Sequence, residues 1–154
     1  MSQQHTTSFT NSTPKNRAGI LVFDAKKRLL VIHRVKDNRV PQEFYAIPGG
    51  TIEEHETTEQ AALRELKEET GLTIHLGPLF LELTNQNRQE YYFLAQSWTG
   101  TPMLGGQEAL DHNSSNQFNL VWLTREQLMH ENLYPEPLKT ALLAYYTHIY
   151  KSNP

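Results

Sequence analysis

The fold of this chain is decided between residues 50 and 72, where the sequence reads GTIEEHETTEQAALRELKEETGL. Thr57 followed three residues later by Gln60 is a capping box, a common start of an α-helix. Alanine, leucine and other good helix formers follow, and Gly71 stands where a glycine commonly ends a helix. The pattern therefore predicts a helix over Thr57–Thr70.

Three acidic residues of this predicted helix, Glu65, Glu68 and Glu69, are three or four positions apart and share one face. Like charges at these spacings destabilise a helix by roughly 0.2–0.5 kcal/mol per pair. The last helical turn also disfavours an anion by about 0.3–1 kcal/mol. Arg64 and Lys67 relieve only part of this repulsion. A divalent cation would remove it, and oxygen ligands favour Mg²⁺ or Mn²⁺. The alternative is a solvated acidic face without a metal.

The spacing of the whole stretch resembles the Nudix box, a signature of glycine, glutamate, arginine and aliphatic positions. Every fixed position of that signature is filled here, by Gly50, Glu56, Arg64, Glu65, Leu66, Glu68, Glu69, Gly71 and Leu72. The residues that lead into the box, Tyr45 to Gly49, are also similar to those of many members. The chain is thus identified as a member of the Nudix hydrolase family, of MutT-like type.

This resemblance implies hydrolysis of a diphosphate bond in a nucleoside diphosphate linked to another group. It implies Glu65, Glu68 and Glu69 as ligands of Mg²⁺ or Mn²⁺, with the Gly50 carbonyl as a further candidate. One of these glutamates, or one outside the box, would orient or deprotonate the attacking water, and we favour Glu65 for that role. Such a reaction depends on charge neutralisation and an aligned water more than on covalent chemistry.

Other candidate site residues flank these glutamates. Glu56 and Arg64 fit a structural ion pair that fixes the helix to its loop, and Arg64 counts among the catalytic candidates. Outside the box, Glu108 follows two glycines that permit close approach to phosphates, with a flexible surface loop as the alternative. Glu90 is a second acidic candidate. Tyr91 can stack on a base, although an aromatic residue in a strand more often belongs to the core.

Basic residues outside the box are candidates for phosphate contacts, with ordinary surface cations as the alternative for each. They are Arg34, Lys36, Arg39 and Arg88. The formal net charge of −3 and the lack of a basic stripe argue against broad nucleic-acid binding. A small anionic nucleotide carrying its own cation stays compatible with this charge.

Length and composition predict one compact domain over residues 17–152, after a flexible polar tail over 1–16; the predicted strands and helices put this domain in the α/β class. The 154 residues suffice for one core, with 38% hydrophobic and 20% charged residues. No apolar stretch approaches the roughly 20 residues that span a bilayer. The N-terminus lacks the apolar core of a signal peptide. The chain has no cysteine, which excludes thiol chemistry and suits a reducing cytoplasm.

Periodicity and turn residues predict an order of elements that mixes hairpins with helices able to cover both faces of a sheet. This order is similar to the Nudix α/β/α sandwich with a mixed sheet, which is the fold that the resemblance implies. The predicted strands are Ala18–Phe23, Arg28–His33, Phe44–Ile47, Leu79–Thr84, Tyr91–Ser97 and Phe118–Leu123. A turn is expected at Arg88–Glu90. Thr124 is expected to cap a short helix that runs through His130. A last helix is predicted over Pro137–Tyr150, because apolar residues recur there at helical spacing.

Substrate class is predicted by elimination within the family. Hydrolases of ADP-ribose carry a proline about 15–18 positions past the box, where this chain has Asn87 and Arg88. Hydrolases of dinucleoside polyphosphates carry a tyrosine there, and Tyr91 lies slightly too far along. A MutT-type nucleoside triphosphate pyrophosphohydrolase is the leading prediction. The alternatives are hydrolysis of dinucleoside polyphosphates or nucleotide sugars, a catalytically silent nucleotide-binding module, and a purely structural domain. A homodimer is possible.

Overall fold

The computed structural model describes residues 15–37 and 42–151, and the fold is built from the following elements. The strands are β1 (Arg17–Leu21), β2 (Leu29–Lys36), β3 (Gln42–Ala46), β4 (Gly49–Thr51), β5 (Thr73–Asn85), β6 (Arg88–Thr99) and β7 (Asn116–Leu123); the helices are α1 (Thr58–Thr70), α2 (Gly106–Asp111), α3 (Arg125–His130) and α4 (Glu136–Lys151). Most of the predicted tail and Arg39 fall outside the described residues.

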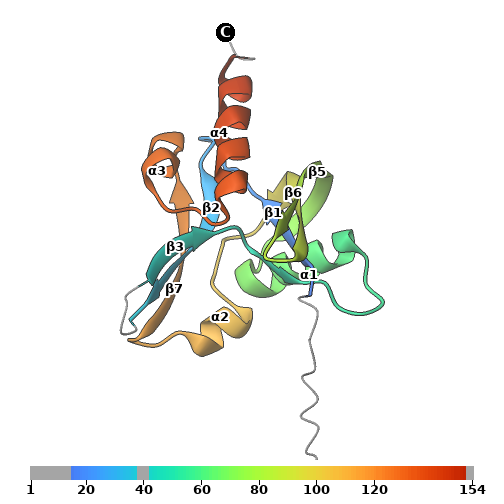
Figure 1. Ribbon diagram of the computed structural model, residues 1–154, viewed down its shortest axis with the longest axis vertical. Coiled ribbons are helices and arrows are strands. Elements are labelled where there is room, and N and C mark those ends of the chain that lie inside the picture. The colour runs from blue at the N-terminus through green and yellow to red at the C-terminus, as the bar shows by residue number, and fades with distance from the viewer. Residues whose placement is uncertain (1–14, 38–41, 152–154) are drawn as a thin grey trace, which may run out of the picture.

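The strands form two sheets (Figure 1). One has the order β4-β1-β6-β5 and the other has the order β3-β2-β7. β1 runs parallel to β6, whereas the remaining pairs within the sheets are antiparallel. This confirms the mixed strand arrangement predicted from the sequence.

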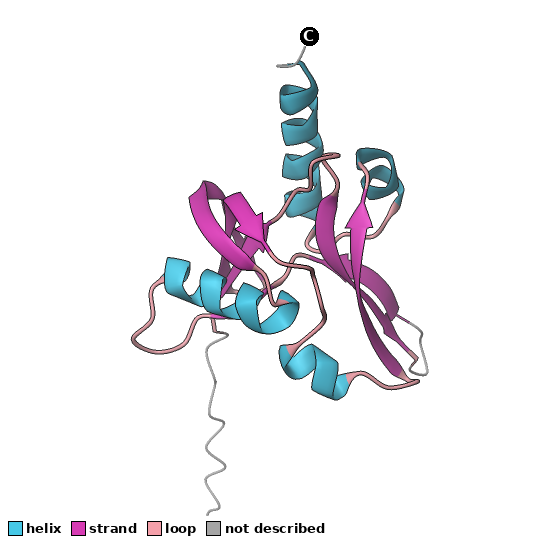
Figure 2. Ribbon diagram, turned by 180° about the vertical axis from the view of Figure 1, so that it is seen from behind, coloured by secondary structure: helices cyan, strands magenta, loops and turns pink. Residues whose placement is uncertain are grey.

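Helices cover the sheets on two sides, with α4 at the top and α1 toward the bottom of Figure 2. From α1, the buried residues Ala61, Ala62 and Leu66 pack in one core cluster with strand residues such as Ile20. A second cluster joins the buried residues of α4 to the opposite faces of the strands; it includes Leu138, Leu142, Tyr146, Leu21, Val31 and Leu123. The predicted α/β/α sandwich is confirmed.

Local capping explains why the helices begin and end where they do. At the start of α1, the Thr57 hydroxyl accepts from the Gln60 N–H and the Gln60 side chain accepts from the Thr57 N–H. Gly71 ends this helix in the left-handed region, with φ of 75°. Thr124 caps α3 in the same way as Thr57 caps α1. The predicted ends of both helices are confirmed within one residue.

The hairpin between β5 and β6 turns at Gln86 and Asn87, whereas the sequence analysis placed the turn at Arg88–Glu90, which was wrong. Both Gln86 and Asn87 have positive φ, 50° and 64°, as a tight two-residue hairpin requires. Asparagine tolerates this region better than most residues. The consequence is that Arg88 and Glu90 lie in β6, where neighbouring strands fix their positions.

Two short elements were not predicted. β4 contains two glycines, which have low strand propensity, yet it pairs with β1 because the strands approach closely. A Cβ on Gly49 would lie 2.3 Å from the Ala18 carbonyl oxygen. The segment around Glu108, which the sequence left as a loop, forms the single turn and a half of α2. This helix buries none of its residues, so its local sequence carries little signal.

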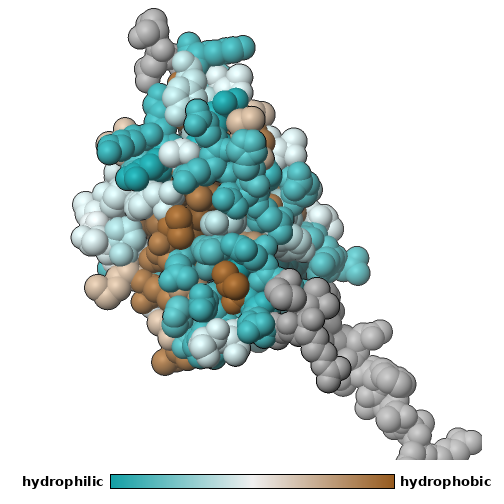
Figure 3. All heavy atoms as spheres, turned by 90° about the vertical axis from the view of Figure 1, so that its left-hand side faces the viewer, coloured by the Kyte–Doolittle hydropathy of each residue, from teal (hydrophilic) through white to brown (hydrophobic). Residues whose placement is uncertain are grey.

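Apolar residues on the surface gather in a stripe across the face shown in Figure 3, framed by hydrophilic residues. Among the described residues, the most exposed large apolar side chains are Leu110 in α2 and Met103 just before it, 80% and 74% exposed. No helix in the described part of the chain is long and apolar enough to cross a membrane.

Candidate active site

A cavity of about 290 Å³ opens between the two sheets, beside the C-terminal end of α1. Strands β2, β3 and β7 supply one wall, β1 and β6 supply the opposite wall, and α1 and α2 each supply a glutamate. Its lining residues are Arg17, Ile32, Arg34, Phe44, Ala46, Gly49, Glu69, Arg88, Glu90, Tyr92, Glu108, Phe118, Tyr134 and Pro135. The cavity thus combines acidic, basic and aromatic side chains in a small space.

Glu69 lies at the acidic end of the cavity and is only 2% exposed. The Gly49 N–H donates to its Oε2 at 2.8 Å. Burial, reinforced by the nearby charge of Glu108, raises the pKa of Glu69 to about 9, although Arg17 and the Gly49 N–H act in the opposite direction. Glu69 is therefore a carboxyl group whose negative charge the surrounding protein does not balance.

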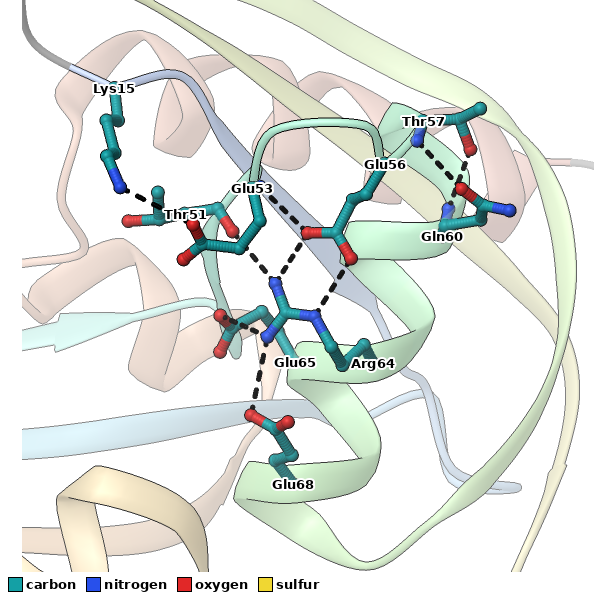
Figure 4. Close-up of polar contacts among 9 residues, drawn as sticks. All are labelled: Lys15, Thr51, Glu53, Glu56, Thr57, Gln60, Arg64, Glu65 and Glu68. Atoms are coloured by element: carbon teal, nitrogen blue, oxygen red, sulfur yellow. Dashed lines mark hydrogen bonds and ion pairs between the residues drawn. The ribbon is translucent and has the colours of Figure 1, made fainter.

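Arg64 connects the helix to the preceding loop (Figure 4). Its Nη2 and Nε donate to the two oxygens of Glu56 at 2.6 and 2.9 Å, and Nη2 also donates to the Thr51 carbonyl at 3.0 Å. Its Nη1 donates to Glu65 at 2.9 Å and to Glu68 at 3.4 Å. The hydrogen bonds from Arg64 are the main reason that the pKa of Glu56 falls to about 2.

Glu65 lies against the backbone of β4. A Cβ on Gly50 would stand 2.4 Å from the Glu65 Cδ, so a larger residue here would displace the Glu65 carboxyl group. Burial raises the pKa of Glu65, opposed by Arg64 and assisted by the charges of Glu68 and Glu108. A half-buried carboxylate with a raised pKa is a better base than a free one.

Glu108 comes to the cavity because the segment before α2 closes the end of α1. The Met103 N–H donates to the Thr70 carbonyl at 2.9 Å, and the Gly105 N–H donates to the Glu69 carbonyl at 2.8 Å. These bonds satisfy carbonyls that a helix end leaves unpaired. A Cβ on Gly105 would meet a backbone oxygen of the helix at 2.4 Å, so the glycine permits this approach.

The acidic residues affect one another's pKa, but in the described part of the chain they do not form a complete metal site. Within residues 15–37 and 42–151, no three acidic, histidine or cysteine side chains converge closely enough to hold a metal ion as they stand. Glu65 is engaged by Arg64 and Glu69 by the Gly49 N–H, while Glu68 is largely exposed. The donors are nevertheless all carboxylates with excess negative charge, which fits a hard divalent cation.

A buried network around Glu90 forms the wall across the cavity from β2. Glu90 is 0% exposed and accepts hydrogen bonds from the Tyr92 hydroxyl at 2.5 Å, from Asn85 at 3.0 Å and from Arg88 at 2.8 Å. Burial acts to raise the pKa of Glu90, but these three donors outweigh it and the pKa falls below its ordinary value. Asn85 also bonds the Tyr134 hydroxyl, which ties the hairpin to the segment before α4.

The structure separates the remaining predicted candidates. Arg34 and Arg88 line the cavity, whereas Lys36 does not. Tyr91 packs against the core cluster beside α1, in agreement with the core alternative, and its neighbour Tyr92 lines the cavity instead.

The sequence analysis missed three further groups of the cavity: Arg17, Tyr134 and the phenylalanines of β3 and β7. Arg17 donates to the Ile47 carbonyl at 2.7 Å. Its one sequence signal is an arginine immediately before a predicted buried strand. The other groups gave none, because strand register brings them together.

Comparison with known proteins places the chain in a family. A model of the NUDIX domain matches residues 13–143. The chain is 30% identical over 86 residues to 8-oxo-dGTP diphosphatase of Escherichia coli (strain K12), which covers 53% of this chain and 66% of that protein. It is 36% identical over 76 residues to RNA pyrophosphohydrolase of Sphingopyxis alaskensis, which covers 49% of this chain and 44% of that protein. The matched segments thus span less than two thirds of these curated relatives.

The solved structures agree on the fold. A MutT protein from Methanosarcina mazei Go1 matches with a TM-score of 0.64 and 17% identity, over 87% of this chain and 94% of that chain. At this identity the likeness shows the fold alone. Because the family model covers most of the chain, the protein belongs to the NUDIX domain family and has the fold of the MutT-like Nudix hydrolases.

Proposed function

We propose that this protein is a divalent-cation-dependent hydrolase of a diphosphate bond in nucleotides, with nucleoside triphosphates as its leading substrate class. The observation that carries this proposal is the buried, charge-crowded state of Glu69 at the cavity, next to Glu108 and on the same helix as Glu65. A protein without cation chemistry would have little reason to keep several carboxylates where burial opposes their ionisation. The names of the two curated relatives, a diphosphatase and a pyrophosphohydrolase, favour the same reaction class.

We assign the cation to Glu65, Glu68 and Glu69, with the Gly50 carbonyl as a further ligand and Glu108 as an additional carboxylate. When bound, Mg²⁺ or Mn²⁺ would neutralise phosphate charge at this end of the cavity. The protein's own contribution is to orient these groups: Arg64 fixes the helix to its loop, and α2 holds its glutamate over the helix end.

The water that attacks phosphorus requires a base, and we favour Glu65. Its pKa is raised by burial, which strengthens it as a proton acceptor near neutral pH. The Arg64 guanidinium holds one oxygen of this carboxylate at 2.9 Å, which restricts the orientation of the group. Arg17 and Arg88, on the wall formed by β1 and β6, provide positive charge for the anionic substrate.

The proposal is tested by measuring phosphate and pyrophosphate release from a panel of nucleotides with Mg²⁺ or Mn²⁺. The panel holds nucleoside triphosphates, dinucleoside polyphosphates, nucleotide sugars and a 5′-triphosphorylated oligonucleotide, and product analysis identifies the bond that is cut. Turnover should disappear in EDTA and fall by orders of magnitude in Glu68→Gln, while Glu126→Gln on α3 should match the wild type. Activity that survives EDTA or Glu68→Gln would contradict the proposal. Tight binding without turnover across the panel would favour a silent binding module.

A further inference from the structure

Arg34 lies in the middle of a flat row of side chains on the cavity wall formed by the three-stranded sheet. Strand register pairs it directly with Phe44 of β3 on one side and Phe118 of β7 on the other. The guanidinium carbon lies 5.7 Å from the centre of the first ring and 4.8 Å from that of the second. The two rings thus fix the position of the cation by cation–π attraction.

The neighbouring row of the same wall is apolar. Ile32 lies two residues before Arg34, so its side chain is on the same face of β2. Register pairs Ile32 with Ala46 and Leu120 on either side. Lys36, two residues after Arg34, lies on the same face but does not line the cavity. Arg34 is therefore the cation that this wall presents to the cavity, among apolar and aromatic side chains that suit a planar ring more than a phosphate.

The donors of Arg34 are not fully used by the protein. Its Nε is buried and has no hydrogen-bond partner among the described residues. The other two arginines that line the cavity do have partners, since Arg17 donates to the Ile47 carbonyl and Arg88 pairs with Glu90. The two Nη groups of Arg34 are not buried, and they too make no hydrogen bond or ion pair among the described residues. They are the donors that an acceptor on a bound ligand would meet, and an unpaired donor favours such an acceptor.

The diphosphate of a substrate would be held elsewhere. Phe44, which is in register with Arg34, precedes Gly49 and its bound Glu69 carboxylate by five residues. Arg34 lies on the three-stranded sheet, whereas the glutamates of α1 lie on a helix that packs against the four-stranded sheet. Phosphates gathered at these glutamates therefore leave Arg34, on the other wall of the cavity, to another part of the nucleotide, which is its base.

We propose that Arg34 selects the base, and that the cavity prefers bases with a carbonyl oxygen over bases with an amino group in its place. Arginine offers only donors. Guanine, hypoxanthine, uracil and thymine present an acceptor oxygen at that edge, whereas adenine and cytosine present an amino donor. The nucleotide class of the ligand rests on the proposed function; the preference rests on the unpaired donor and its two flanking rings.

Calorimetric binding of inosine and adenosine 5′-monophosphates in EDTA tests this inference, because the two differ mainly at the carbonyl or amino group. The wild type should bind the inosine nucleotide at least about fivefold more tightly. Arg34→Met should bring the ratio close to one. Arg34→Gln should lower it further, because an amide pairs well with adenine. If one variant is shown by its melting curve to be unfolded, the other decides.

The matched control is Arg125→Met. Arg125 also has a buried Nε without a partner among the described residues, but it lies on α3 and does not line the cavity. Its substitution should leave the binding ratio unchanged. Equal binding of both nucleotides by the wild type, no binding of either at millimolar concentration, or a ratio retained in both Arg34 variants would overturn the inference.

The two proposals fail separately. Neither monophosphate contains a diphosphate bond, so selective binding can be observed in a protein that hydrolyses nothing, which would leave this inference standing without the enzymatic one. Conversely, hydrolysis of inosine and adenosine triphosphates with equal kcat/KM would contradict the proposed base preference and support the proposed reaction.

Discussion

Glu69→Gln should stabilise the metal-free protein at neutral pH. The pKa of Glu69 rises from an ordinary value of 4.5 to about 9 in the folded chain. Between these values the folded protein keeps a proton that the unfolded chain has released, so stability falls as pH rises. One pH unit corresponds to about 1.4 kcal/mol for such a group. Glutamine carries no such penalty and can still accept from the Gly49 N–H, so the variant should be about 3 kcal/mol more stable at pH 7.

The assay is urea unfolding in EDTA, followed by tryptophan fluorescence at several pH values from 4.5 to 9. The difference in stability between variant and wild type should be near zero at pH 4.5 and grow steadily toward pH 9. Glu68→Gln is the control, since its side chain is 52% exposed and a surface change should stay within about 0.5 kcal/mol. A difference that does not depend on pH would refute the view of Glu69 as a carboxyl group that resists ionisation.

Addition of Mn²⁺ extends the same experiment. A ligand at 100 times its dissociation constant stabilises the folded state by about 2.7 kcal/mol. The wild type should gain roughly this amount at pH 7, and the advantage of Glu69→Gln should narrow accordingly, because the variant lacks one anionic ligand. Equal gains in the two proteins would show that Glu69 does not contribute to cation binding.

The remaining predictions concern Arg64, which bonds Glu56 and Glu65, and the buried Glu90 of β6. Arg64→Ala should lower the melting temperature by several degrees and weaken Mn²⁺ binding, because Glu56 loses both of its hydrogen bonds from Arg64; an unchanged melting curve would contradict this. Glu65→Gln should instead lower kcat with little change in melting, so equal losses of stability in these two variants would argue against a base role. Tyr92→Phe should destabilise by about 1–3 kcal/mol at pH 7, because Glu90 loses a donor. That deficit should shrink as the pH falls below 4.5 and through the lowered pKa of Glu90, because protonation removes the stability that the carboxylate contributes, as denaturation at pH 3 and 7 would show.

The helix of the box could be predicted from sequence because its signals are local. Both halves of its capping box lie within four residues, and Gly71 follows the last turn. Each of these signals depends on hydrogen bonds between near neighbours, which a single sequence displays. The same holds for α3, whose cap repeats the pattern at Thr124. The spacing of apolar residues predicted the last helix equally well, since its buried residues recur at helical intervals.

The walls of the cavity could not be predicted in this way. Arg34 meets Phe118 only because β2 pairs with β7 in one register, across more than eighty residues of chain. A shift of one residue would turn each of these side chains to the opposite face. Burial of Glu90 depends likewise on where its hairpin turns, and the predicted turn begins two residues too late. Long-range register, not propensity, determines which polar groups face the cavity.

The helix of the box and the walls of the cavity carry different information about the substrate. The box fixes the carboxylates, and every fixed position of its signature is filled here, so this part of the site says little about which nucleotide is bound. The groups that differ in chemistry, such as an unpaired guanidinium between two rings, lie on strands outside the box. The box therefore supports the proposed reaction class and leaves the nucleotide open. The identity of the base has to be argued from the wall formed by β2, β3 and β7, where Arg34 is the group that distinguishes a carbonyl from an amine.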